Sequence, residues 1–267
     1  FFEDIKRYID FKKNKKIVTI HFRDSLYRKD YNRRIFRNSS IKNAYKAINY
    51  LLDKGYFVVR IGNLAKEKFN INHPNFLDYP FSKIVSDKLD VFFIKNSNFF
   101  IGTQSGLVAI ADIFNVPVLL LNMYQLFEGY PKKKCDRGIF KNILFKKDNK
   151  NLSIEEFMKL PHEYHHSNMK KEFYGNLEFY ENTEIQIYTA IKEFEFLYSR
   201  GQLNLHTSEQ IKFNKLLKKY LIHIYNFNSD KAKHNKNNNN LADFNEFYKN
   251  LRYGLFIKGA IFNIKSE

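Results

Sequence analysis

The segment NFFIGTQSGLVAIADIFNVPVLLLN (residues 98–122) decides the fold class. Residues 98–102 form a short apolar run, which leads into a helix pattern over 103–115 that Thr103, Gln104 and Ser105 open. A second apolar run follows at 116–122. Apolar runs bounded by Gly and Pro are typical of buried strands. The segment therefore predicts a strand, a crossover helix and a second, parallel strand.

The chain upstream repeats this alternation. KIVTIHF (16–22) and YFVVRIG (56–62) are predicted strands. A helix is expected over 39–55, with Ser39 or Ser40 as its N-cap and Gly55 as its C-terminal stop, and another helix over 86–96. This order predicts an α/β fold, a doubly wound parallel sheet of the Rossmann-like type.

The pattern weakens after residue 122. Residues 123–175 are interpreted as irregular with one short helix near LSIEEFMKL, followed by helices over 182–200 and 208–226. Residues 231–240 are a polar low-complexity loop. We therefore expect a Rossmann-like domain over 1–200 and a helical C-terminal extension over 201–267.

The formal net charge of +17 would favour a nucleic acid, an anionic membrane surface or a phosphorylated substrate. Abundant Lys, Asn, Phe, Ile and Tyr without Trp are, however, typical of an AT-rich genome, so the lysines carry little weight. The arginines differ, because five of the ten lie between Arg23 and Arg37. Arginine binds planar anions in a bidentate manner, so this cluster indicates an anionic ligand.

Several classes of site are disfavoured. Cys135 is the one cysteine, which excludes an intramolecular disulfide and a Cys-rich zinc site and fits a cytoplasmic protein. The histidines of PHEYHHS (161–167) have no spacing that would converge on a metal, so we expect no metal site. No apolar run reaches the roughly 18 residues of a membrane span.

Ligands bind outside the carboxyl ends of the strands in an open parallel sheet, and the candidate site residues lie there. They are His21, Arg23 and Asp24 after the first strand, Arg28 in the arginine cluster, Arg60 and Gly62 after the second strand, Gly102, Thr103, Gln104, Ser105 and Gly106 after the third, and Asn122 after the fourth.

The IGTQSGL segment predicts a phosphate cradle. Gly102 and Gly106 allow a ligand close to the backbone, and the first N–H groups of the helix favour an anion. The pattern is neither a Walker A loop nor G-x-G-x-x-G, which argues against a P-loop NTPase and an ordinary NAD enzyme. Each of these features also has a structural interpretation. Residues 102–106 could form an ordinary strand-to-helix turn, and the arginines could pair with Asp24 or Asp30. His21 could have a structural role instead of acting as a base.

Five motifs together carry a resemblance: VTIHFRD, AINYLLDKGYFVVRIG, LDYPFSK, FFIGTQSGL with FNVPVLLLN, and ENTEIQ. Over about residues 16–200 the chain resembles a bacterial glycosyltransferase family of surface-polysaccharide clusters. That family is similar to the nucleotide-sugar-binding, C-terminal half of GT-B enzymes, including O-fucosyltransferase-like proteins.

The resemblance implies transfer of a sugar from a nucleotide-diphosphate sugar to a surface glycan or lipid-linked acceptor, without a cofactor or metal. It implies that Arg23, in a His-x-Arg motif with His21, neutralises the departing diphosphate and that residues 102–106 contact the phosphates. Asp24 stands where the fucosyltransferase pattern has a second arginine, so the donor is not assigned. An acceptor domain is expected upstream.

Two other readings stay open. One is a nucleic-acid-binding protein, motivated by the net charge, although no nucleic acid is expected as a partner. The other is a non-catalytic domain that binds a nucleotide sugar. A peripheral contact of this cytoplasmic protein with the inner membrane also stays open.

Overall fold

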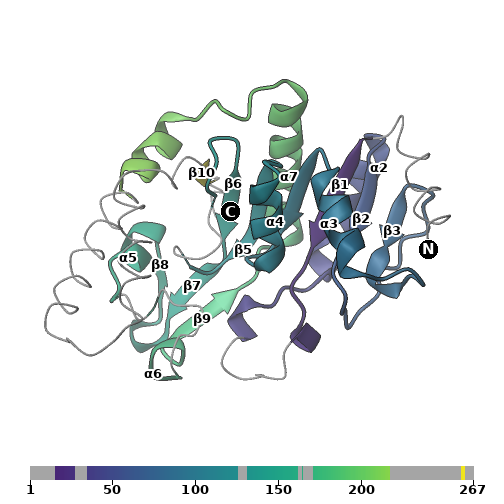
Figure 1. Ribbon diagram of the computed structural model, residues 1–267. Helices are drawn as coiled ribbons and strands as arrows, with labels where there is room; N and C mark the ends of the chain where they lie inside the picture. The colour runs from purple at the N-terminus through teal and green to yellow at the C-terminus, as the bar shows by residue number, and fades with distance from the viewer. Residues whose placement is uncertain are drawn as a thin grey trace, which may run out of the picture.

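The computed structural model describes residues 16–27, 35–125, 131–161, 164, 171–216 and 260–261. Its centre is a seven-stranded sheet in the order β10-β6-β5-β4-β1-β2-β3, and every neighbouring pair is parallel (Figure 1). The strands are β1 (Ile17–His21), β2 (Phe57–Arg60), β3 (Phe76–Asp78), β4 (Phe99–Gly102), β5 (Val118–Met123), β6 (Arg137–Phe140) and β10 (Ala260–Ile261). The doubly wound α/β prediction is confirmed.

The strand order reverses between β1 and β4. The chain moves from β1 to β2 and β3 on one side, and from β4 to β5 and β6 on the other. In such sheets the crevice outside the carboxyl ends of the two strands at the reversal is the usual place for a ligand. Here β1 ends at His21 and β4 at Gly102, and these two residues are paired in register.

Helices cover both faces of the sheet because the strand side chains alternate. Val18, Ile20 and Ile101 face α2 (Tyr45–Asp53) and α7 (Glu184–Ser199) in one core. Residues such as Val59, Phe100 and Leu120 face α3 (Asp87–Lys95) and α4 (Gly106–Ile113) in the other. The molecule therefore has three layers, and both faces of β1 and β4 are buried.

The helix ends follow local sequence signals in most places. Ser86 caps α3 by accepting the N–H of Leu89, and Thr183 forms a capping box with Gln186 at the start of α7. Gly55, with φ +80°, follows α2 as expected. The Ser40 hydroxyl accepts the Lys42 N–H at 3.1 Å, as expected of a cap, although the segment begins with a 3₁₀ turn at Lys42–Ala44 and α2 itself has no side-chain cap.

Residues 123–175 are more regular than predicted. Besides β6 they contain β7 (Asn142–Phe145) and β8 (Lys150–Leu152), which pair antiparallel with each other. β9 (Leu177–Tyr180) pairs antiparallel with the other edge of β7. We call these three strands the small sheet. The strands were missed because three or four residues are too few to show a period, and β3 was missed for the same reason.

The remaining elements are short. The predicted helix near LSIEEFMKL is α5 (Ile154–Met158), and α6 covers Lys171–Tyr174. Residues 208–216 are helical as expected, and the rest of that predicted helix and the 231–240 loop lie outside the described residues. No helix in the described part of the chain is long and apolar enough to cross a membrane.

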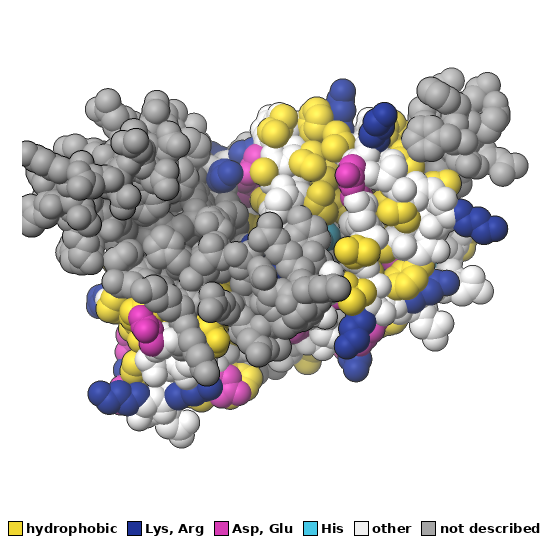
Figure 2. Space-filling view, turned by 60° about the horizontal axis from the view of Figure 1, so that its bottom comes forward, with side chains coloured by type: hydrophobic (Ala, Val, Ile, Leu, Met, Phe, Trp, Pro, Cys, Tyr) yellow, Lys and Arg dark blue, Asp and Glu magenta, His cyan; other side chains and the backbone are white. Residues whose placement is uncertain are grey.

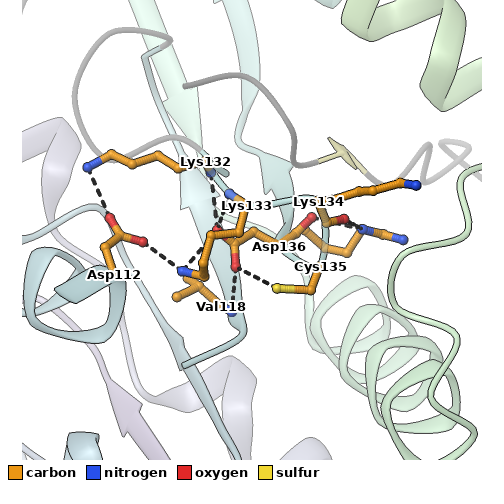
Figure 3. Close-up of polar contacts among 8 residues, drawn as sticks. Asp112, Val118, Lys132, Lys133, Lys134, Cys135 and Asp136 are labelled. Carbon is orange, nitrogen blue, oxygen red and sulfur yellow. Dashed lines mark hydrogen bonds and ion pairs between the residues drawn. The ribbon is translucent and has the colours of Figure 1, made fainter. Parts of the chain in front are cut away.

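A buried carboxylate joins β5 and β6 at the edge opposite their carboxyl ends (Figure 3). Asp136 is 1% exposed and accepts the backbone N–H groups of Val118, Lys132 and Lys133 at 2.8–3.1 Å. The Lys133 ammonium lies 3.2 Å from Asp136 and 2.8 Å from Asp112. Burial raises the pKa of Asp136 against the opposing effect of Lys133. This carboxylate fixes the start of both strands.

Asp136→Ala should lower the free energy of unfolding by about 3–5 kcal/mol, because it leaves three backbone N–H groups without their acceptor and removes one of the two carboxylates that face the Lys133 ammonium. Urea unfolding measures this. The control is Lys159→Ala, which removes an exposed ion pair with Glu155 at 3.1 Å and should change stability by less than about 1 kcal/mol. Equal losses in the two variants would contradict the role of Asp136.

Candidate functional site

The loops after β1 and β4 are joined by hydrogen bonds at the strand reversal. The Thr103 N–H donates to the His21 carbonyl at 3.1 Å, and the Arg23 N–H donates to the Thr103 hydroxyl at 3.0 Å. Ser105 Oγ lies 3.2 Å from His21 Nδ1. The structure therefore brings the first and third groups of predicted site residues together, and the Thr103 and Ser105 hydroxyls contact protein groups.

Arg23 lies at the edge of a pocket at this reversal. Its side chain is 7% exposed, and its Nη1 donates to Asn38 Oδ1. The Ser39 N–H donates to the Arg23 carbonyl at 3.0 Å, so the segment 38–40 runs beside the arginine. The pocket has a volume of about 170 Å³ and is lined by Arg23, Asp24, Ser25, Asn38, Ser39, Ser40, Ile41, Lys66, Glu67 and Glu181.

Most of the other arginines of the cluster lie outside the residues that the structure describes. Arg28, Arg33 and Arg34 lie outside the described residues. Arg37 is described, and its guanidinium lies over the Tyr124 ring at 5.8 Å. It does not line the pocket of Arg23.

His21 lies in a positive environment. Burial, and then the charges of Arg60 and Arg23, lower its pKa to about 4. The imidazole is therefore neutral at pH 7. Gly62 packs against the ring, since a Cβ at Gly62 would lie 3.4 Å from His21 Cδ2.

Arg60 and Gly62 are held by acidic side chains. Arg60 is 2% exposed, lies 3.3 Å from Asp78 and donates to the Glu67 carbonyl at 2.6 Å. Gly62, with φ +115°, donates its N–H to Asp90 at 3.0 Å. Burial raises the pKa of Asp90 to about 6, although the hydrogen bond from Gly62 opposes this. The positive charge of Arg60 thus helps to lower the pKa of His21, while the Arg60 side chain itself contacts Asp78 and the Glu67 carbonyl.

Gly102 and Gly106 differ in what surrounds them. A Cβ at Gly102 would lie 2.8 Å from the His21 carbonyl oxygen, so the pairing of β4 with β1 requires glycine there. A Cβ at Gly106 would meet no described atom within 4 Å, and Gly106 has no positive φ. Packing within the described structure therefore explains Gly102 and gives no reason for Gly106, the first residue of α4.

Three further predicted residues organise the loops. Gln104 accepts the Tyr124 N–H at 2.8 Å and donates to the Gln125 carbonyl at 3.0 Å. Asp24 accepts the N–H groups of Leu26 and Lys66 at 2.9 and 2.7 Å.

Asn122 has φ +52° and exchanges hydrogen bonds with Asn182, with N–O distances of 2.7 and 2.6 Å. It also donates to the Ser39 hydroxyl at 2.6 Å. Asn122 is 1% exposed and does not line the pocket of Arg23.

Two residues near Arg23 were missed by the sequence analysis. Glu181 lines the pocket, and one of its oxygens accepts the Ser40 N–H at 2.8 Å. Lys141 is 3% exposed and its ammonium donates to the carbonyls of Phe36 and Asn38 at 3.0 and 2.8 Å, while burial lowers its pKa to about 8. Glu181 opens the ENTEIQ motif, which was a usable signal, whereas Lys141 had none.

Positive side chains do not gather over one element on the face in Figure 2. The described Lys and Arg side chains are spread around that face. The described residues on this face therefore give no support to the nucleic-acid hypothesis.

A scan against family models and a search of curated proteins gave no match for this chain. Solved structures do match. One is the dodecameric iron-containing heptosyltransferase TibC in complex with ADP-D-β-D-heptose, at 16% identity and a TM-score of 0.37, covering 71% of this chain and 46% of that chain. Another is the iron-containing dodecameric glycosyltransferase TibC from enterotoxigenic E. coli H10407, at 17% identity and a TM-score of 0.35, covering 70% and 48%. This chain thus spans about half the length of those proteins.

One expectation is corrected by these matches. We expected no cofactor, but both matched proteins are described as iron-containing. Among the described residues no group of three or more His, Cys, Asp or Glu side chains could hold a metal ion. The described residues therefore do not fit an iron site.

The two glycines give a matched pair of substitutions. Gly102→Ala should lower the free energy of unfolding by about 1–3 kcal/mol, because its Cβ overlaps backbone. Gly106→Ala should be neutral or stabilising by up to about 1 kcal/mol. Urea unfolding of both variants checks this. A large loss in Gly106→Ala, or none in Gly102→Ala, would contradict the geometry.

His21 should make stability depend on pH. Its pKa is about 4 in the folded protein and 6.5 ordinarily, so between these values the unfolded chain binds a proton that the folded chain does not. The stabilisation present above pH 6.5 is therefore lost progressively as the pH falls to 4. Relative to His21→Gln, which removes this titration, the wild type should lose unfolding free energy between pH 7 and pH 4. Parallel curves for the two proteins would contradict a low pKa.

Proposed function

We propose that the chain is the donor-binding part of a glycosyltransferase and that the diphosphate of a nucleotide-diphosphate sugar binds at the strand reversal. The observation that carries this proposal is the placement of Arg23. Arg23, which is 7% exposed, lines a pocket directly beyond the paired ends of β1 and β4. The open space at Gly106 adds support, because a phosphate oxygen could approach the first N–H groups of α4 there.

Glycosyl transfer leaves negative charge on the departing diphosphate, and preorganised donors lower the barrier to that step. In this proposal Arg23 supplies a fixed positive charge, which its bond to Asn38 and the packing of segment 38–40 hold in place. The N-terminal amides of α4 supply further donors. Such groups need no reorientation as charge develops.

The neutral imidazole of His21 fits a donor role better than that of a base. A group with a pKa of about 4 is a weak base at pH 7. If the Ser105 hydroxyl donates to Nδ1, then Nε2 carries the hydrogen and can donate it to an anion. Burial, with the charges of Arg60 and Arg23, keeps the ring uncharged in the free protein.

The sugar and the nucleotide are left open in this proposal. The resemblance to O-fucosyltransferase-like GT-B enzymes favours a donor of that class, but Asp24 replaces the second arginine. The two carboxylate oxygens of Asp24 accept the backbone N–H groups of Leu26 and Lys66, so Asp24 stabilises the conformation of the loop. A surface glycan or a lipid-linked saccharide is the acceptor that this resemblance favours.

A binding screen with UDP, GDP, dTDP, ADP and CMP tests the proposal. One nucleoside diphosphate should raise the melting temperature, and Arg23→Ala should weaken its binding by roughly tenfold or more, since a hydrogen bond to a charged group contributes about 1.5–3 kcal/mol. Gly106→Ala should also weaken binding. Arg200→Ala is the control, because this exposed arginine lies over the Phe196 ring at 4.3 Å, away from the pocket.

The results of this screen distinguish the three hypotheses for the function. The absence of binding by any nucleotide, or unchanged binding in Arg23→Ala, would overturn the site. Binding without hydrolysis or transfer of the matching nucleotide sugar would support a non-catalytic domain. Binding of DNA or RNA that falls steeply with salt would favour the nucleic-acid reading.

A further inference from the structure

A second pocket lies on the small sheet. It has a volume of about 580 Å³ and is lined by Asn142, Ile143, Leu144, Asn149, Asn151, Leu152, Ser153 and Tyr180. In the sheet register Asn142 is opposite Tyr180, and Leu144 is opposite Asn151. We call this the small-sheet pocket.

The face of the small sheet that carries Asn142 and Tyr180 is its outer face. Side chains alternate along a strand, and Ile143 and Phe179 belong to the core on the inner side. Asn142, Asn149 and Asn151 are exposed, and none of them makes a side-chain hydrogen bond to another described residue. Three amide groups are therefore available to a ligand in this pocket.

The small-sheet pocket is uncharged, which is distinctive in a chain with 27% charged residues. None of the described residues that line it is Lys, Arg, Asp or Glu. The nearby Lys150 forms an ion pair with Glu156. Tyr180 also has a hydrogen bond with Glu178. The chemistry of this pocket therefore favours a neutral ligand over a phosphate or a nucleic acid.

A saccharide matches this lining. A pyranose ring has an apolar C–H face and a rim of hydroxyls that both donate and accept hydrogen bonds. Tyr180 is 45% exposed and offers an aromatic ring to the apolar face. An asparagine amide donates and accepts at the same time, as a hydroxyl rim requires. Leu144 lies between these groups on the same face of the sheet.

The small-sheet pocket is close to the proposed donor site. Tyr180 lines it, and the next residue, Glu181, lines the pocket of Arg23. Consecutive Cα atoms are about 3.8 Å apart, so neighbouring residues at the end of β9 contribute to the two pockets. The small sheet is also anchored at the carboxyl edge of the main sheet, by Lys141 before β7 and by Asn182 after β9 (Figure 1).

We propose that the small-sheet pocket binds a neutral saccharide unit, the acceptor end of a glycan, through the Tyr180 ring and the amides of Asn142, Asn149 and Asn151. The identification as an acceptor rests on the proposed transferase function. The binding of a neutral saccharide does not, and it is measured without any nucleotide.

The test is saturation-transfer NMR of the full chain with a panel of methyl pyranosides and linear oligosaccharides of glucose, galactose, mannose and N-acetylglucosamine. At least one should bind. Tyr180→Ala should weaken that binding by about tenfold or more, and Asn151→Ala should weaken it as well. Tyr180→Phe should retain most of the binding, because the ring remains.

The matched control is Phe196→Ala, which removes an aromatic ring of similar exposure, 47%, from α7. Circular dichroism and the melting temperature confirm that each variant is folded. No binding by any saccharide of the panel would overturn the proposal, and so would binding that Tyr180→Ala leaves unchanged or that Phe196→Ala weakens equally. UDP or another nucleotide should not displace the saccharide, so a failed nucleotide screen and a failed saccharide screen are distinguishable.

Discussion

The close pairing of β1 with β4 at His21 and Gly102 is the constraint on which the rest of the site depends. Without a Cβ, Gly102 lets the His21 carbonyl approach to a distance at which a side chain would overlap it. The next amide, that of Thr103, donates to this carbonyl, and the Thr103 hydroxyl receives the Arg23 N–H. One short contact thus sets both loops at the strand reversal. Because both strands are buried on both faces, neither loop can shift without disturbing the core.

Buried positive side chains lie near the strand reversal between β1 and β4. Arg23, Arg60 and Lys141 are all less than 10% exposed, at 7, 2 and 3%, and they lie near the carboxyl edge. Arg60 forms an ion pair with Asp78. Arg23 donates a hydrogen bond to the amide oxygen of Asn38, and Lys141 donates to two backbone carbonyls. The pocket that Arg23 lines also contains Lys66 and the carboxylates of Asp24, Glu67 and Glu181. Burial, with the charges of Arg60 and Arg23, keeps His21 uncharged.

The small sheet gives the fold its second feature of functional interest. It follows β6 after a single residue and leads into α7 through Glu181 and Asn182, so both of its ends lie at the edge where Arg23 lies. The described residues that line the pocket on its outer face are uncharged, whereas the pocket of Arg23 contains both cations and carboxylates. Tyr180 and Glu181, consecutive at the end of β9, each line one of the two pockets. In the proposed function the small-sheet pocket would hold the saccharide and the pocket of Arg23 the diphosphate.

The sequence alone determined the fold class and the edge at which to look. β1, β2, β4, β5 and the capped helices have local periods and end signals, and in a parallel sheet these fix which residues follow each strand. The strands β3 and β6–β9 were not predictable, because segments of three or four residues carry too little pattern. Tertiary structure alone decided the partners. Glu181 reaches Ser40 across 141 residues of sequence, and Lys141 reaches Asn38 across 103. Contacts at such separations leave no local signature, since only the packed sheet brings those residues together.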